Sequence, residues 1–198
     1  GKYLTPGLAD MHAHPMTERD LHAYITSGVT LIRSMWGEPA VLALREGVAT
    51  GEILGPRIFT GGRIVDGEPV IHYGSDRVLT EEEAEAVVAR HKAAGYDFIK
   101  VYSNLSVEAF DAIVAAAKRH EIPVEGHIPA AVPTVHAFRN MRAAEHLIGI
   151  EEATLADEAR SVKRWDPTFP AYAASLGRGE TSLSEQFDNC LLYTSDAA

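Results

Sequence analysis

The chain is 198 residues long, with 46% apolar and 23% charged residues, which suits a globular protein with one sizeable core. With 18 Lys and Arg against 28 Asp and Glu, the net charge is −10, and no basic stripe is available to neutralise a nucleic-acid backbone. No run of about 18 apolar residues suggests a transmembrane helix, and the single cysteine, Cys190, excludes a disulfide framework and a cysteine-based metal site.

Short apolar stretches alternate with segments of helical periodicity along the first 150 residues. Thr80 with Glu83 forms a capping-box sequence, Ser106 is a second capping residue, and glycines close several of the helical segments. A glycine-rich loop through Gly61, Gly62, Gly67 and Gly74 follows the third strand region. In chain order we predict a strand at 8–11, a helix at 17–27, a strand at 29–33, a helix at 39–50, a strand region from 57, a helix at 81–94, a strand at 97–102, a helix over 106–117, a strand at 122–127, a helix at 133–141 and a strand at 143–147.

This alternation predicts an α/β fold with a parallel sheet, which is either doubly wound or closed into a barrel. An open sheet gathers its ligands at one switch point, whereas a barrel brings every strand end to one mouth. Polar residues lie at the carboxyl ends of the first, fourth, fifth and sixth predicted strands, spread around the sheet. We therefore predict a (β/α)8 TIM barrel of which about strands 1–6 are present.

Five side chains at these strand ends suggest a metal site. His12 and His14 are two residues apart in a strand, so they point to the same side and can bind one cation, although nine histidines also make a chance pair plausible. Lys100 is flanked by apolar residues; it either reaches solvent along its own stem or reacts with carbon dioxide to give a carbamate that bridges two cations. His127 and His146 each end a strand and are either metal ligands or ordinary histidines.

Taken together, the HxH pair on the first strand, Lys100 on the fourth, His127 on the fifth and His146 on the sixth resemble the amidohydrolase superfamily of metallo-dependent hydrolases. The resemblance extends over roughly residues 1–150. Four segments resemble one branch of this superfamily, the imidazolonepropionase-like and Xaa-Pro dipeptidase-like branch. They are residues 3–14 (YLTPGLADMHAH), 55–58 (GPRI), 98–102 (FIKVY) and 145–147 (EHL).

This resemblance implies a barrel, a small β-sandwich built from both chain ends, and two divalent metal ions, usually zinc. His12 and His14 would hold the first metal and His127 and His146 the second. Lys100, carbamylated by carbon dioxide or bicarbonate, would bridge them, and we name Lys100 and His146 as the catalytic pair. A metal-bridging hydroxide would attack the amide carbonyl. The family's aspartate at the end of strand eight has no counterpart in this sequence.

Substrate-facing candidates are fewer. Tyr102 could donate a hydrogen bond to a substrate carboxylate or be a packed barrel tyrosine, and His72, in the loop after the third strand, could bind the same carboxylate. Trp36 follows the second strand and lines the barrel mouth or packs in the core. The four histidines on helical segments are expected to be solvated: His22, His91, His120 and His136.

After residue 150 the barrel rhythm fades. Residues 151–165 have a helical pattern, but strands seven and eight are not found, so we interpret residues 1–189 as part of a barrel domain. Residues 190–198 (CLLYTSDAA) resemble a translated transposase adapter, which indicates a non-native tail and a metagenomic gene fragment. Asp188, beside this junction, is not accepted as the catalytic aspartate. The chain does not begin with Met, so cytoplasmic and secreted or periplasmic locations both stay open.

The sequence thus predicts that the full-length protein is a binuclear metal-dependent amidohydrolase that cleaves amide bonds of small molecules such as dipeptides or N-acyl amino acids. We expect this fragment alone to be inactive. Within the enzymes, the alternatives are a cyclic-amide hydrolase of the imidazolonepropionase kind and an ester or organophosphate hydrolase. A different class of alternative is an inactive metal-binding fragment. A downstream strand ending in Asp favours the enzyme. Homo-oligomerisation of the full-length protein stays open, and the residues leave the substrate and the metal unidentified.

Overall fold

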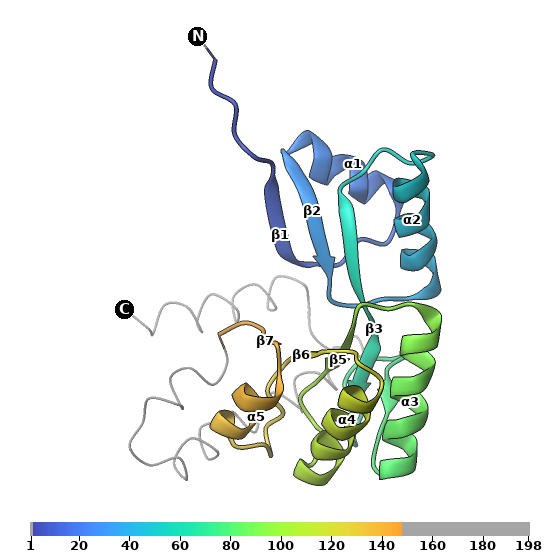
Figure 1. Cartoon of the computed structure of the whole chain (residues 1–198), viewed down its shortest axis with the longest axis vertical. Helices are drawn as coiled ribbons and strands as arrows, with labels where there is room; N and C mark the ends of the chain where they lie inside the picture. The colour runs from blue at the N-terminus through green and yellow to red at the C-terminus, as the bar shows by residue number, and fades with distance from the viewer. Residues whose placement is uncertain (1, 148–198) are drawn as a thin grey trace, which may run out of the picture. The chain divides into compact units, whose positions relative to one another are not determined.

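The computed structural model of the chain describes residues 2–147 (Figure 1), which fall within one compact unit. The predictions for residues 151–165, Asp188 and the tail at 190–198 lie outside the described residues. No helix in the described part of the chain has both the length and the apolar character needed to cross a membrane.

Strands and helices alternate as the sequence predicts. The helices are α1 (Glu18–Thr26), α2 (Pro39–Thr50), α3 (Glu81–Ala94), α4 (Val107–Arg119) and α5 (Thr134–Asn140). The strands are β1 (Leu8–Ala13), β2 (Val29–Ser34), β3 (Arg57–Asp66), β4 (Asp76–Arg77), β5 (Phe98–Val101), β6 (Val124–Gly126) and β7 (Ala143–Ala144).

Every strand pairing is parallel, and the strands follow one another in the order β1-β2-β3-β5-β6-β7, with β4 paired to β3. The order never reverses, so the sheet lacks the switch point of a doubly wound fold. A parallel sheet in sequential order with helices between its main strands is the arrangement of part of a (β/α)8 barrel. The predicted barrel class is confirmed.

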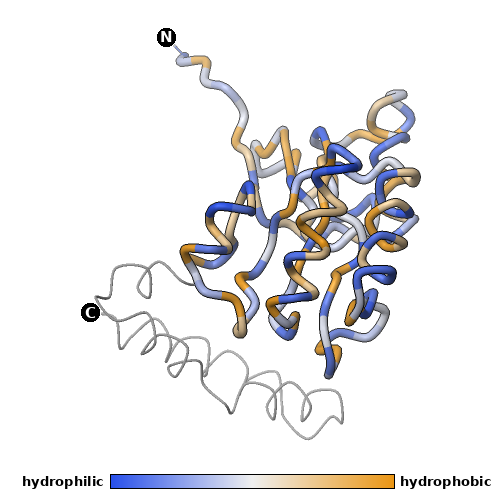
Figure 2. Tube along the Cα trace, turned by 60° about the horizontal axis from the view of Figure 1, so that its bottom comes forward, coloured by the Kyte–Doolittle hydropathy of each residue, from blue (hydrophilic) through white to orange (hydrophobic). Residues whose placement is uncertain are grey.

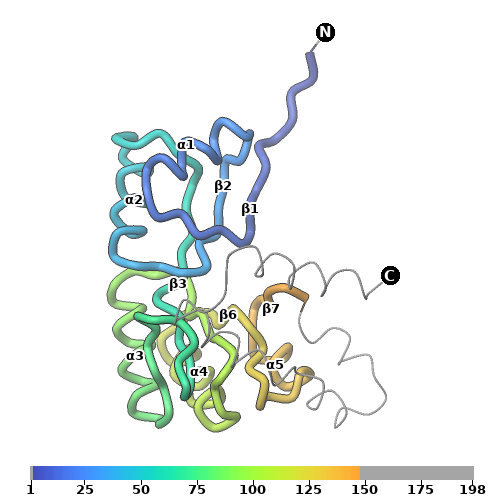
Figure 3. Tube along the Cα trace, turned by 180° about the vertical axis from the view of Figure 1, so that it is seen from behind, coloured from blue at the N-terminus to red at the C-terminus, as the bar shows by residue number. Residues whose placement is uncertain are grey.

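The long strand β3 lies between β1 and β2 on one side of the sheet and β5 to β7 on the other (Figure 3). Its first part, residues 57–60, pairs with β2, and its later part, residues 61–65, pairs with β5. One buried cluster packs α1 and α2 against β1 to β3, around Leu21, Ile32 and Val41. A larger cluster packs α3 and α4 against β5 and β6, around Ile99 and Phe110.

Capping residues fix where the helices begin. Thr80 accepts from the Glu83 backbone N–H and forms the predicted capping box, and Ser106 accepts from the Ala109 N–H at 3.1 Å. Hydrophobic and hydrophilic residues alternate along the helices in Figure 2, as expected when one face of each helix packs on the sheet and the other meets solvent.

The structure differs from the sequence prediction in three places. β3 continues through Gly61 and Gly62 to Asp66, where a loop was predicted, because this backbone pairs with β5. The two-residue strand β4 lies between the predicted loop and the predicted helix, and so short a strand leaves no periodic pattern. β7 ends at Ala144 and not at Leu147, because His146 and Leu147 have φ angles of 61° and 58°, which no β-strand accommodates.

Candidate functional site

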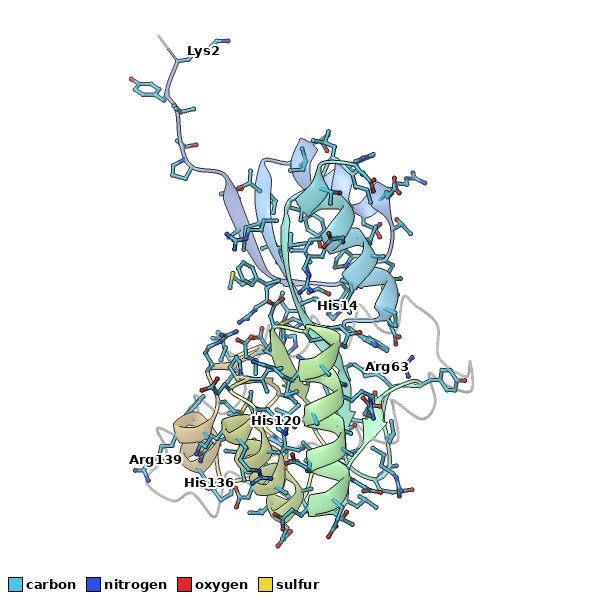
Figure 4. The ribbon with its side chains drawn as sticks, turned by 45° about the vertical axis from the view of Figure 1, so that its right-hand side comes forward. Lys2, His14, Arg63, His120, His136 and Arg139 are labelled. Atoms are coloured by element: carbon cyan, nitrogen blue, oxygen red, sulfur yellow. The ribbon has the colours of Figure 1, made fainter. Side chains whose placement is uncertain are left out.

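The carboxyl ends of four strands bring the five predicted metal-binding side chains to one pocket. His12 lies near the end of β1 and His14 directly after it (labelled in Figure 4), and Lys100 lies in β5. His127 and His146 follow β6 and β7. All five side chains line a cavity of about 420 Å³. The strand order, and no local sequence feature, places them together.

The four imidazole rings form a chain in which each ring is close to the next. Their centroids are 5.2 Å apart between His14 and His12, 4.5 Å between His12 and His146, and 4.9 Å between His146 and His127. Two imidazoles bound to one zinc ion through bonds of about 2.0–2.1 Å have centroids about 5 Å apart in tetrahedral geometry. The spacing therefore suits a cation bound between two neighbouring rings. It is similar for all three neighbouring pairs of rings.

Burial keeps three of these rings uncharged. It lowers the pKa of His14 to about 4, helped by the nearby His12 and Lys100. Burial, with Lys100 and His146 close by, lowers the pKa of His127 to about 2, and burial beside His12 and Lys100 also lowers the pKa of His146. A neutral imidazole carries the lone pair that a metal requires. These rings are therefore available as ligands near neutral pH.

Lys100 is only 1% exposed, so the alternative of a solvated lysine is wrong. Burial lowers the pKa of its amine to about 8, opposed by the charge of Glu145. At pH 7 about 10% of such amines are neutral, compared with about 0.03% at the ordinary lysine pKa. The neutral amine is the form that reacts with carbon dioxide.

The two carboxylates that influence Lys100, Glu125 and Glu145, already have other partners. Glu125 is fully buried and Glu145 is 6% exposed. Their ion-pair partners are Arg33 and Arg142 for Glu125, and Arg33 and His12 for Glu145. Among residues 2–147, Lys100 has no carboxylate within ion-pair distance, which leaves its amine free for other chemistry.

Aromatic side chains line the same pocket beside the histidines. His72 Nε2 lies 2.8 Å from the Tyr102 hydroxyl, and the ring of His72 packs against Trp36 with centroids 5.2 Å apart. Tyr102 stacks on His127 at 4.0 Å. Burial raises the pKa of Tyr102 to about 12, so its phenol stays protonated and can donate a hydrogen bond. Both predicted substrate-binding residues and Trp36 line the cavity, together with Met16 and Ile64, which the sequence did not single out.

The backbone is under steric constraint at this pocket. His146 has a φ of 61°, a left-handed conformation that costs a non-glycine residue of order 1–3 kcal/mol and clusters at functional sites. Gly126, just before His127, has a φ of 132°, and a Cβ there would lie 2.2 Å from the Val101 carbonyl oxygen and 3.0 Å from the Lys100 side chain. Only glycine lets β6 approach β5 this closely beside Lys100.

Three further residues hold the pocket side chains and were missed by the sequence reasoning. Glu145 Oε2 lies 2.7 Å from His12 Nδ1, and Ser103 Oγ lies 3.1 Å from His127 Nδ1. Asp66 accepts backbone N–H bonds from Gly67 at 3.0 Å, Ile71 at 3.3 Å and Asn104 at 2.7 Å, and so fixes the loop that carries His72. The sequence offered one signal for Glu145, because this residue directly precedes a histidine at the end of a strand.

Whether these side chains suit metal ions depends on Lys100. Within residues 2–147, no three side chains of the types His, Cys, Asp and Glu are placed to hold one ion. The four histidines offer only pairs of neighbouring rings, and a lysine ammonium cannot ligate a cation. A carbamate on Lys100 would add an anionic ligand beside these rings, and with that ligand the set would suit metal ions.

One of the four helical histidines is buried, although all four were predicted to be solvated. His91 is 2% exposed, because Nε2 lies 2.8 Å from Asp76 Oδ2 and the ring packs against Tyr96 and Gly62. Helical position alone does not reveal that α3 turns this histidine towards the sheet. The other three are exposed or half-buried away from the pocket: His22, His120 and His136.

The chain matches no protein-family model and no curated protein sequence. Among solved structures it is similar to a bottromycin amidohydrolase, with 33% identity, a TM-score of 0.70, and coverage of 80% of this chain and 38% of that one. It is also similar to a prolidase candidate from Bifidobacterium longum, with 30% identity, a TM-score of 0.51, and coverage of 62% and 35%. A Xaa-Pro dipeptidase with bound methionine, 24% identical with a TM-score of 0.51, shares the fold over 62% of this chain and 43% of its own. The chain thus spans well under half the length of these proteins.

Proposed function

The chain belongs to the amidohydrolase superfamily, and from that premise we propose that the protein is a binuclear metal-dependent hydrolase that cleaves an amide C–N bond of a small molecule. Similar structures are a bottromycin amidohydrolase and a prolidase candidate, both names for hydrolases of amide bonds. Dipeptides and N-acyl amino acids are the substrates proposed first.

One observation carries this proposal: the convergence of His12, His14, Lys100, His127 and His146 on one cavity. These residues come from four strands and span 134 positions of the chain, and nothing in the packing of a barrel requires a buried lysine there. A buried ionisable side chain without a carboxylate partner, in a cleft beside neutral imidazoles, is the pattern expected of a functional site.

We propose that Lys100 is carbamylated. Its neutral amine would form an N–C bond to carbon dioxide and lose a proton, which leaves an anion with two oxygens between the two histidine pairs. His12 and His14 would hold one cation and His127 and His146 the other, and the imidazole ligands favour zinc. Two bound cations would polarise the scissile carbonyl and lower the pKa of the attacking water.

The chain's own side chains would orient the substrate. Tyr102 keeps its phenolic proton, and its hydroxyl lies beside His72 at 2.8 Å, so the pair can hold a carboxylate or carbonyl of the substrate at the cavity wall. Met16, Trp36 and Ile64 add apolar surface to the lining of the cavity. An acyl or side-chain group of low polarity therefore fits beside the histidines.

A screen with matched substrates tests this function. Purified full-length protein would be incubated with zinc and bicarbonate and assayed against dipeptides, N-acyl amino acids, cyclic amides and the corresponding esters. We expect amide turnover, with kcat/KM lowered by roughly 100-fold or more in Lys100→Ala, since even an outer-shell partner of a metal ligand is worth 10–100-fold. Turnover of esters alone would refute amide specificity.

A second variant separates substrate binding from metal binding. Tyr102→Phe removes the hydroxyl and keeps the ring that stacks on His127. We expect KM to rise for substrates with a free carboxylate and to change little for the matching carboxamides, with metal content unchanged. Bound metal without turnover of any substrate would support the inactive metal-binding alternative.

A further inference from the structure

A single arginine, Arg33 of β2, links side chains from distant strands across the inside of the curved sheet. Its Nε donates to the Met11 carbonyl at 2.8 Å, Nη1 to Glu125 Oε2 at 2.9 Å, and Nη2 to Glu145 Oε1 at 2.5 Å. The strands β2 and β6 are not neighbours in the sheet, so this guanidinium spans its concave side. All three of its nitrogens are engaged, and 12% of the side chain is exposed.

Glu145 connects Arg33 to His12. One carboxylate oxygen accepts from Arg33, and the other lies 2.7 Å from His12 Nδ1. A carboxylate held ionised by an arginine is an acceptor only, so Nδ1 must carry the hydrogen. In the neutral ring the lone pair is then on Nε2, the atom left for the cavity that His12 lines.

Of the four histidines proposed as metal ligands, only His12 has a carboxylate behind its ring within the described residues. His127 Nδ1 faces the Ser103 hydroxyl at 3.1 Å, and a hydroxyl either donates or accepts, so it does not select a tautomer. No hydrogen bond to a ring nitrogen of His14 or His146 occurs within residues 2–147. Among these four rings, the ion pairs of Arg33 and Glu145 therefore orient the ring of His12.

We propose that Arg33, acting through Glu145, is a positioning residue that fixes His12 as the Nδ1–H tautomer and so prepares its Nε2 as a ligand. The ligand role of His12 rests on the proposed function, whereas the tautomer does not. A carboxylate behind a ligating histidine typically fixes the ring orientation and raises its basicity. The alternative is an ion-pair network that only ties the strands together, and the two differ in what happens to the His12 ring.

Imidazole ¹⁵N spectra of the metal-free protein measure this tautomer directly. We expect the wild-type His12 ring to be wholly Nδ1–H. Glu145→Gln removes the charge and offers an amide that either donates or accepts, so we expect a mixture of the two tautomers. A single Nε2–H form in the wild type, or an unchanged ring in Glu145→Gln, would overturn the positioning role.

Arg142→Met is the matched control. Arg142 pairs with Glu125 on the other side of the network and does not contact Glu145, and its side chain is 55% exposed. A purely structural network would respond to both variants, whereas the positioning role predicts no change at His12 in Arg142→Met. The ring of His136, paired with Asp111 on the surface, serves as the reference for a folded protein in each spectrum.

Should Glu145→Gln fail to fold, Arg33→Lys carries the same test, because a lysine keeps the charge but cannot engage Glu125 and Glu145 together through a planar fork. We expect a partial tautomer mixture in that variant, and a ring that stays wholly Nδ1–H would overturn the proposal. Zinc affinity, measured by competition with a chromophoric chelator, should fall roughly 10–100-fold in Glu145→Gln. The expected tautomers without zinc binding would refute the proposed function and leave the positioning role intact.

Discussion

Replacing Lys100 by methionine should stabilise the metal-free protein. The side chain is 1% exposed, and burial lowers the pKa of its amine from 10.5 to about 8. The unfolded chain binds this proton more tightly than the folded one, so the penalty is complete below pH 8 and disappears as the pH rises through 10.5. Lowering the pKa of Lys100 from 10.5 to about 8 corresponds to about 3 kcal/mol of stability. Methionine has a similar length and carries no charge, so Lys100→Met should remove most of this penalty.

Urea denaturation in a degassed, chelator-containing buffer measures the effect. We expect the free energy of unfolding to rise by about 2–3 kcal/mol at pH 7 and the difference from wild type to shrink towards zero by pH 10.5. Lys118→Met, at an exposed position of α4, is the control and should change little at either pH. A destabilised Lys100→Met, or a gain that does not depend on pH, would refute the reasoning that Lys100 is kept at a cost in stability for its function.

Two further stability predictions use matched pairs. Asp76→Asn leaves the buried His91 without its charged partner and should lower the free energy of unfolding by about 1–3 kcal/mol. Asp111→Asn breaks the exposed pair with His136 and should change the free energy of unfolding little. Equal losses of stability in thermal or urea unfolding would contradict the role of burial. Gly126→Ala would place a Cβ 2.2 Å from a backbone oxygen and should cost more than Gly28→Ala, where only the φ of 81° is unfavourable and nothing lies within 4 Å. Similar unfolding midpoints for the two glycine variants would show that β6 shifts to make room.

Much of the fold could be predicted because its signals are local. Capping residues such as Thr80 and Ser106 fix where helices begin, and the apolar periodicity that follows them marks the helices. The polar residues at successive strand ends indicate a barrel from the sequence alone. The positions of Lys100, His127 and His146 after successive strands were enough to predict that they meet, since a barrel brings all its strand ends to one mouth.

The supporting contacts were not predictable in the same way. Arg33 and Glu145 are 112 residues apart, and their contact depends on how strongly the sheet curves, which no sequence pattern records. His91 was wrongly expected in solvent because the rotation of α3 about its axis is set by packing against Gly62 and Tyr96. The left-handed backbone at His146 is likewise imposed by tertiary structure, since only a small fraction of histidines adopt a positive φ.

The central claim is that the pocket holds two cations joined through Lys100, and counting bound metal tests it most directly. Protein loaded with zinc in the presence of bicarbonate would be dialysed and its metal content measured by mass spectrometry, alongside Lys100→Ala and a bicarbonate-depleted sample. We predict two zinc ions per wild-type chain, and one or none in both Lys100→Ala and the depleted wild type. Two ions retained by Lys100→Ala would contradict the bridging role of the lysine, and none bound by the wild type would contradict the metal site itself.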